Sequence, residues 1–84
     1  MSTTIDGVPV NPGMTLALGD GDYLFGAGAV TVVIRQVLGV MTFRDECWVE
    51  MEADQHFPGY QPIPRTMTVR LGAIADSTKA TVQR

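Results

Sequence analysis

Apolar and polar residues alternate along several short stretches of the chain, and Gly and Pro residues separate these stretches. At 66–71 and again at 47–53, every second residue is apolar. Successive side chains of a β-strand point to opposite faces of a sheet, so both stretches are predicted to be strands with one buried face. The alternation places Cys47 on the buried face and Trp48 on the outer face.

A longer stretch, 29–37, carries apolar residues on both of its alternating faces. Such a strand is expected at the centre of a sheet, or with one face against a partner. Residues 38–41 are expected to extend it past a bulge or bend at Gly39.

The other segments predict shorter elements. Residues 14–18 alternate as a short strand, and residues 23–25 are a candidate return strand. Near the start of the chain, Asp6-Gly7 is a favourable two-residue hairpin turn, and Pro9 confines that hairpin to a sheet edge. A short apolar piece at 73–74 ends the series.

The expected fold class is all-β, because no window has the i, i+3, i+4, i+7 apolar repeat of a helix with a cap before it. We expect a small antiparallel barrel of five to six strands over residues 1–75, followed by a short polar tail, 76–84, that is frayed or disordered. The element order, with its long first loop and short last strand, resembles that of Src-homology-3-like barrels. An oligonucleotide/oligosaccharide-binding barrel is the nearest alternative, but the helix it usually carries between its third and fourth strands has no counterpart here.

Composition narrows the classes of function. The 84 residues are enough for one small domain, and nine acidic against six basic residues give a net charge of −3, which disfavours nucleic acid as the partner. A single cysteine excludes an intramolecular disulfide and favours a reducing, cytoplasmic setting. No apolar run approaches the roughly 20 residues of a membrane-spanning helix, so no membrane partner is predicted.

The Gly- and Asp-rich stretch 19–28 is interpreted as a turn. A phosphate-binding loop would need Lys or Arg nearby and a helix after it. A calcium loop beginning at Asp20 would need Glu at its twelfth position, where this chain has Thr31. We therefore expect glycines at positive φ, aspartates that accept backbone N–H bonds, and no cofactor or metal.

The side chains that could act in catalysis lack the partners or the cleft that catalysis needs. A thiol on the buried face, such as Cys47, behaves as a small hydrophobic group, and with His56 it provides too few ligands for zinc. Glu50 and Glu52 share a strand face at about 6.6–7 Å, a separation that some glycosidases use, but such catalysis also needs a cleft. The chain is therefore predicted not to be an enzyme.

Aromatic residues indicate the candidate binding site. A Trp on an outer face is either covered by its own chain or reserved for a partner, so Trp48 is expected to cap the barrel or to line a groove. In the second case the long first loop and the Pro-rich segment 57–64 add further rings beside acidic side chains, which suits basic or proline-rich peptides. The predicted site comprises Tyr23, Phe25, Trp48 and Tyr60, with Asp22, Glu50 and Glu52 as an acidic rim.

The sequence thus predicts a non-enzymatic binding module or accessory subunit that recognises a protein or peptide partner. A homodimer is a further option, because the strand at 29–37 has two apolar faces. A single-stranded nucleic-acid-binding barrel requires arginines gathered on one face, and a small-ligand-binding barrel requires an apolar cavity with convergent polar groups. These two remain the alternatives.

Overall fold

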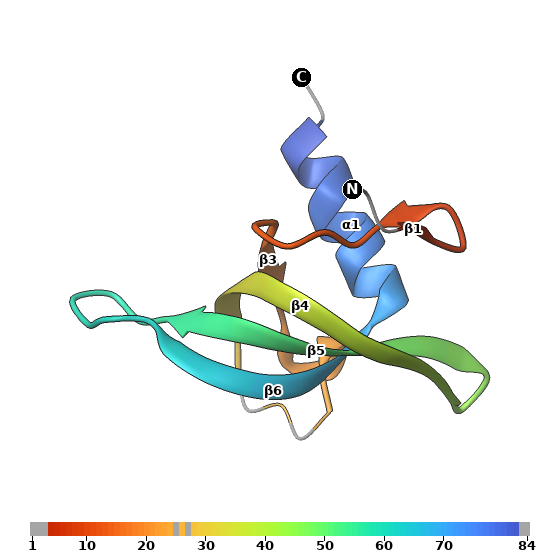
Figure 1. Ribbon diagram of the computed structural model, residues 1–84, viewed down its shortest axis with the longest axis horizontal. Helices are drawn as coiled ribbons and strands as arrows, with labels where there is room; N and C mark the ends of the chain where they lie inside the picture. The colour runs from red at the N-terminus through yellow and green to blue at the C-terminus, as the bar shows by residue number, and fades with distance from the viewer. Residues whose placement is uncertain (1–3, 25, 27, 83–84) are drawn as a thin grey trace.

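A strongly curled antiparallel sheet dominates the computed structural model, which describes residues 4–24, 26 and 28–82 (Figure 1). The sheet has four strands in the order β3-β4-β5-β6, and two further strands form a separate hairpin. The elements are β1 (Thr4–Ile5), β2 (Val8–Pro9), β3 (Thr15–Leu18), the 3₁₀ turn η1 (Asp20–Asp22), β4 (Val30–Phe43), β5 (Glu46–His56), β6 (Ile63–Arg70) and the helix α1 (Leu71–Val82).

The fold is mostly β, as expected, but the sheet forms half of a barrel. Over the described residues, β3 and β6 are the two edges of the sheet and do not pair with each other. A single bridge between Tyr23 and Val69 extends the β6 edge. The small β-barrel expectation is therefore met in part, as a curled sheet rather than a closed one.

Alternate residues of all four strands bury their side chains on the concave face of the sheet, as the sequence pattern predicts. Cys47, on the same side of its strand, is half-buried and packs against this core. The fully or almost fully buried apolar strand residues on this concave face are Leu16 and Leu18 of β3, Val32 and Ile34 of β4, Val49, Met51 and Ala53 of β5, and Met67 and Val69 of β6.

The long strand β4 departs from simple alternation. Its register against β5 shifts twice, between Ile34 and Gln36 and between Val37 and Gly39, which confirms the expected irregularity near Gly39. Each extra residue reverses which positions face the core. Val37 therefore packs against the same core as Ile34, whereas strict alternation predicts the opposite face.

Two hairpins close through turns whose central residues both have positive φ. Asp6 and Gly7, at 49° and 80°, connect β1 to β2 as predicted, and Pro9 lies in the outlying two-stranded sheet. Arg44 and Asp45, at 53° and 63°, connect β4 to β5. These φ values match the twisted two-residue turn that tight hairpins prefer, although non-glycine residues adopt them less readily.

The C-terminal part of the chain is helical, which corrects two expectations. The short strand expected at 73–74 is replaced by α1, which begins at Leu71 directly after β6, and the tail that was expected to be frayed or disordered over 76–84 is helical as far as Val82, with residues 83–84 outside the described residues. Ala73 and Ile74 are buried in its first turns. Burial of these side chains in the core outweighs the weak helical signal of the local sequence.

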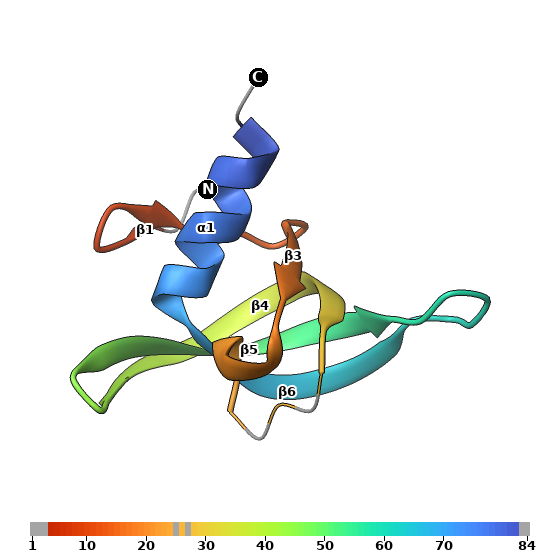
Figure 2. The same ribbon diagram turned by 180° about the vertical axis from the view of Figure 1, so that it is seen from behind.

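The helix covers the concave side of the sheet together with the N-terminal hairpin. Both lie on the same side of the sheet in the two opposite views (Figures 1 and 2). The backbone N–H of Ala17 in β3 donates to Ser77 Oγ of α1 at 3.2 Å. None of the helical segments in the described residues has the length and apolar character needed to cross a bilayer.

Candidate functional site

Tyr23 lies in the core rather than in a surface groove. Its side chain is 4% exposed, and its hydroxyl donates to the carbonyl oxygen of Gly28 at 3.0 Å. The neighbouring Leu24 N–H donates to the Thr68 carbonyl on β6. Tyr23 therefore fastens the long first loop to the sheet, and its expected role in partner binding loses its basis. Phe25, the next predicted ring, lies outside the described residues.

Trp48 is also buried. Its strand register places it on the outer face of the sheet, whereas the next residue, Val49, faces the core. Only 6% of Trp48 is nevertheless exposed. Its Nε1–H donates to the carbonyl oxygen of Phe43 at 3.1 Å, and the two rings meet edge-on with their centroids 6.1 Å apart. The chain itself covers the indole, so the groove alternative for Trp48 is wrong.

Asp22 is committed to contacts within the chain. Its Oδ2 accepts the Gly19 N–H at 2.7 Å, and its Oδ1 accepts a hydrogen bond from Arg70 Nη2 at 3.0 Å. Arg70 also lies 3.5 Å from a carboxylate oxygen of Glu46. The Gly19 hydrogen bond and the Arg70 guanidinium hold the pKa of Asp22 below its usual value, and Asp22 raises the pKa of Arg70.

The same contacts give a prediction for acid stability. Because the folded-state pKa of Asp22 is depressed, its stabilising effect is present above the unfolded-state pKa of about 4 and is lost as pH falls through the folded-state value. Asp22→Asn should cost about 1–2 kcal/mol at pH 7 and less at pH 3, which lies below the unfolded-state pKa. Urea-denaturation midpoints at both pH values test this. Glu52→Gln, which neutralises an exposed carboxylate on the outer face of β5, serves as the control.

The Gly/Asp stretch behaves as the turn that the sequence predicts. Besides Asp22, Asp20 accepts a backbone hydrogen bond, from Gly28 at 2.5 Å, and Gly28 has a φ of +90°. The other described glycines of the stretch do not have positive φ. No group of three or more His, Cys, Asp or Glu side chains within the described part of the chain is arranged to hold a metal ion.

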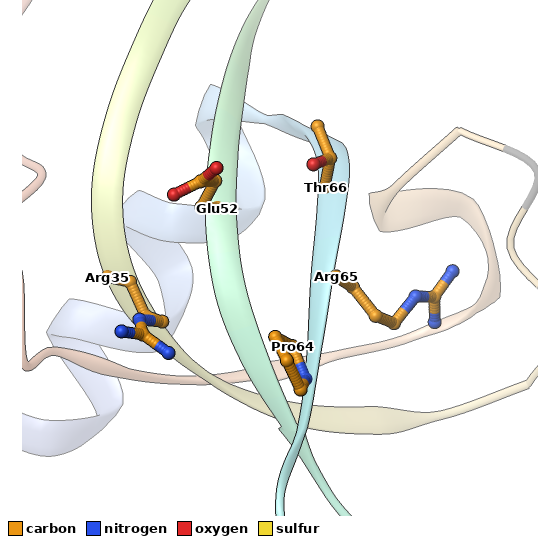
Figure 3. A pocket seen from close by; sticks show the side chains of 5 residues that line it. All are labelled: Arg35, Glu52, Pro64, Arg65 and Thr66. Atoms are coloured by element: carbon orange, nitrogen blue, oxygen red, sulfur yellow. The ribbon is translucent and has the colours of Figure 1, made fainter.

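Glu50 and Glu52 are exposed on the outer face of β5, as predicted. Their cross-strand neighbours on β6 are Thr68 and Thr66, so they do not face an arginine directly. Glu52 borders a depression of ≈ 310 Å³ that it shares with Arg35, Pro64, Arg65 and Thr66. The Arg65 guanidinium points away from Arg35 and Glu52 (Figure 3), so the depression offers no convergent set of polar groups.

Among the described aromatic residues of the predicted site, Tyr60 is the most exposed, at 78%. It follows a turn in which its N–H donates to the Phe57 carbonyl oxygen at 3.1 Å and Gly59 has a φ of +81°. This loop joins β5 to β6, at the end of the sheet opposite the β4–β5 turn (Figure 1). Tyr60 therefore does not meet Trp48, and the predicted aromatic groove is not assembled.

A different apolar surface, which sequence reasoning missed, lies at the β4–β5 end of the sheet. We call it the apolar hairpin end, and it consists of Leu38, Val40, Met41 and Phe43, which are 43%, 53%, 42% and 39% exposed. The hairpin projects beyond the rest of the sheet in both views (Figures 1 and 2). The signal in the sequence is an uncharged run, 36–43, that is longer than the sheet needs to cover its core.

The backbone of this segment has one open side. β3 pairs with β4 over Val30–Val33 only, and the loop before β3 adds hydrogen bonds at Ile34. From residue 36 to residue 43, β4 pairs with β5 on one side, and no described strand pairs with it on the other. We call this side of residues 36–43 the free β4 edge.

The described arginines do not gather on one face. Arg65 pairs across the strands with the core residue Ala53 and so lies on the core side of the sheet, whereas Arg70 pairs with Trp48 and lies on the outer side. The contacts of these cations are Arg35 with Asp54, Arg65 with Gln55, Arg70 with Asp22 and Glu46, and Arg44 over the ring of Phe43. Most of these contacts neutralise or occupy the guanidinium groups that a nucleic acid would need.

A second depression, of ≈ 420 Å³, lies where β3, β4 and the end of β5 meet. Gln55 and His56 are among its lining residues, together with Phe57, but Gln55 is buried and contacts Arg65.

No known family model matches this chain, and no curated protein or solved structure matches it. The surfaces described above therefore carry the functional argument.

Proposed function

We propose that this chain is a non-enzymatic protein-binding module, or accessory subunit, that contacts its partner through the apolar hairpin end. The single observation that carries the proposal is the simultaneous exposure of Leu38, Val40, Met41 and Phe43 on one projecting hairpin. Isolated exposed apolar residues are common, but several exposed apolar residues on one short hairpin are the grouping that interaction sites typically show.

Contacts within the chain restrain the position of the apolar hairpin end. Phe43 packs edge-on against the buried Trp48, its carbonyl accepts the indole N–H, and Arg44 lies over the Phe43 ring at 5.2 Å. These contacts restrict the strand ends before any partner arrives, and an already ordered surface loses less conformational entropy on binding.

The alternatives have less support. A nucleic-acid-binding barrel would need accessible cations on one face, and Arg35 and Arg70 are paired with acids on this acidic chain. A small-ligand barrel would need an enclosed apolar cavity, whereas the two depressions described above are open to solvent. The resemblance to Src-homology-3-like barrels suggested a peptide groove that needs Tyr23 and Trp48 at the surface, and both side chains are buried.

Photo-crosslinking at two matched phenylalanines tests the proposal. Benzoylphenylalanine in place of Phe43, at the apolar hairpin end, should give protein adducts on irradiation in the producing cells. The same probe in place of Phe57, which is equally exposed at the opposite end of the sheet, is the control and should give several-fold less adduct. Equal yields from the two positions, or no adduct from either, would contradict the proposal.

A further inference from the structure

The described methionines differ in how far their side chains are open to solvent. Met51 and Met67 are buried in the core cluster. Met14 is half-buried, and its sulfur accepts a hydrogen bond from the backbone N–H of Asn11 at 3.2 Å. Met41 is 42% exposed. Because an oxidant must contact the sulfur atom, Met41 is the described methionine that is most open to oxidation from solution.

Met41 belongs to the apolar hairpin end and lies on the outer face of the sheet. It pairs with Trp48 of β5, and the preceding β4 residue on the same face, Gly39, pairs with Glu50. A Cβ atom added at Gly39 would have no neighbouring atom within 4 Å, so the surface beside Met41 is open on that side. A dissolved oxidant can therefore approach Met41 while the hairpin stays folded.

The one thiol of the chain lies on the other face of the hairpin. Cys47 is on the core side of β5, where it is half-buried and packs against the core cluster. Thiols react with oxidants as thiolates, whereas a thioether has no proton to lose before it reacts. The oxidation of Met41 therefore needs neither Cys47 nor a deprotonation step, and its rate should change little with pH near neutrality.

We propose that Met41 is a site of reversible oxidation by peroxides, and that this oxidation weakens partner binding at the apolar hairpin end. The sulfur lone pair attacks the O–O bond of the peroxide, and one oxygen atom becomes bonded to sulfur. The other oxygen leaves with both hydrogens as water, so the sulfur is oxidised by two electrons and the peroxide is reduced by two. Methionine sulfoxide reductases reverse the change.

The product explains the expected effect on binding. A sulfoxide is polar, so the modified side chain interrupts the group formed with Leu38, Val40 and Phe43, and its burial against an apolar partner surface costs free energy. The other three members are a leucine, a valine and a phenylalanine, which have no sulfur to oxidise. This inference rests on the proposed function, since it names how binding at that surface is regulated.

Peptide mass spectrometry after treatment of the folded full chain with tert-butyl hydroperoxide tests the site. Trypsin places three methionines in separate peptides, Met41 in 36–44, Met51 in 45–65 and Met67 in 66–70. The peptide 36–44 should gain one oxygen atom several-fold faster than the other two. In urea, where all three side chains are exposed, the rates should converge. Equal rates in the folded chain would contradict the inference.

Photo-crosslinking from position 43 measures the effect on binding. Brief peroxide treatment of the producing cells should lower the adduct yield by about tenfold, because the sulfoxide must be desolvated in the contact. Met41→Leu keeps an apolar side chain of similar volume without sulfur, so this matched control should keep its yield after the same treatment. Met41→Gln, which is polar like the sulfoxide, should lower the yield without peroxide. Circular dichroism verifies that both variants remain folded.

The outcomes separate this inference from the proposed function. If peroxide lowers the adduct yield equally in the wild type and in Met41→Leu, or changes neither, the inference is overturned while the proposed function stands. If position 43 gives no adduct in untreated cells, the proposed function fails, and the inference fails with it.

Discussion

Trp48→Ala is expected to lower the free energy of unfolding by about 3–5 kcal/mol, because the indole is buried and its removal leaves a cavity. The substitution also leaves the Phe43 carbonyl without its donor and removes the edge-on ring contact. Small domains have a total stability of about 5–15 kcal/mol, so this loss takes a large share of it. Urea denaturation followed by circular dichroism measures the effect.

The conservative variant Trp48→Phe separates the contributions of the ring and the hydrogen bond. It keeps an aromatic ring beside Phe43 and loses the N–H donor, so a smaller loss, of about 1–2 kcal/mol, is expected. If Trp48 were instead a partner-contact residue on the surface, both variants would unfold at nearly the wild-type urea concentration. That result would contradict the packing described for the hairpin.

Ile74→Asp is expected to unfold the domain. Ile74 is fully buried in the core cluster, and an unpaired carboxylate there costs several kcal/mol in addition to the lost apolar burial. Ile74→Val removes one methylene group and should cost about 0.5–1.5 kcal/mol. Circular dichroism and urea denaturation of the pair give the measurement.

This pair also tests whether the C-terminal helix belongs to the domain. If residues 71–84 were detached from the sheet, Asp at position 74 would lie in water and both variants would match the wild type. A graded loss, small for Val and complete for Asp, is the result that a docked α1 requires.

The sequence alone predicts the strands well and the helix badly, for a physical reason. Alternation at 47–53 and 66–71 is a local property, so it identifies both the strands and their buried faces. The helix has Gly72 in its first turn, β-branched residues in its last, and no capping residue before Leu71. Its formation depends on the concave face that it covers, which no short window of sequence contains.

The prediction of the candidate site from the sequence is wrong for a related reason. Alternation correctly assigns Trp48 to the outer face of the sheet, but the face of a strand does not determine how much of a side chain is exposed to solvent. Phe43, which covers the indole, is brought there by a two-residue turn between non-glycine residues and by two register shifts in β4. Each shift inverts the apparent pattern, so the uncharged run at 36–43 is visible in the sequence while its solvent exposure is not.

The shared packing of the first and last elements has a consequence for how the domain forms during synthesis. Val10, which follows β2, and Ile74 of α1 belong to one core cluster, and β2 contacts α1. In a ribosome-bound chain that lacks the helix, the N-terminal hairpin therefore has no helix to pack against, and the concave face of the sheet stays exposed to solvent. We expect the final cooperative step to wait until residue 74 has left the exit tunnel and can pack against the sheet.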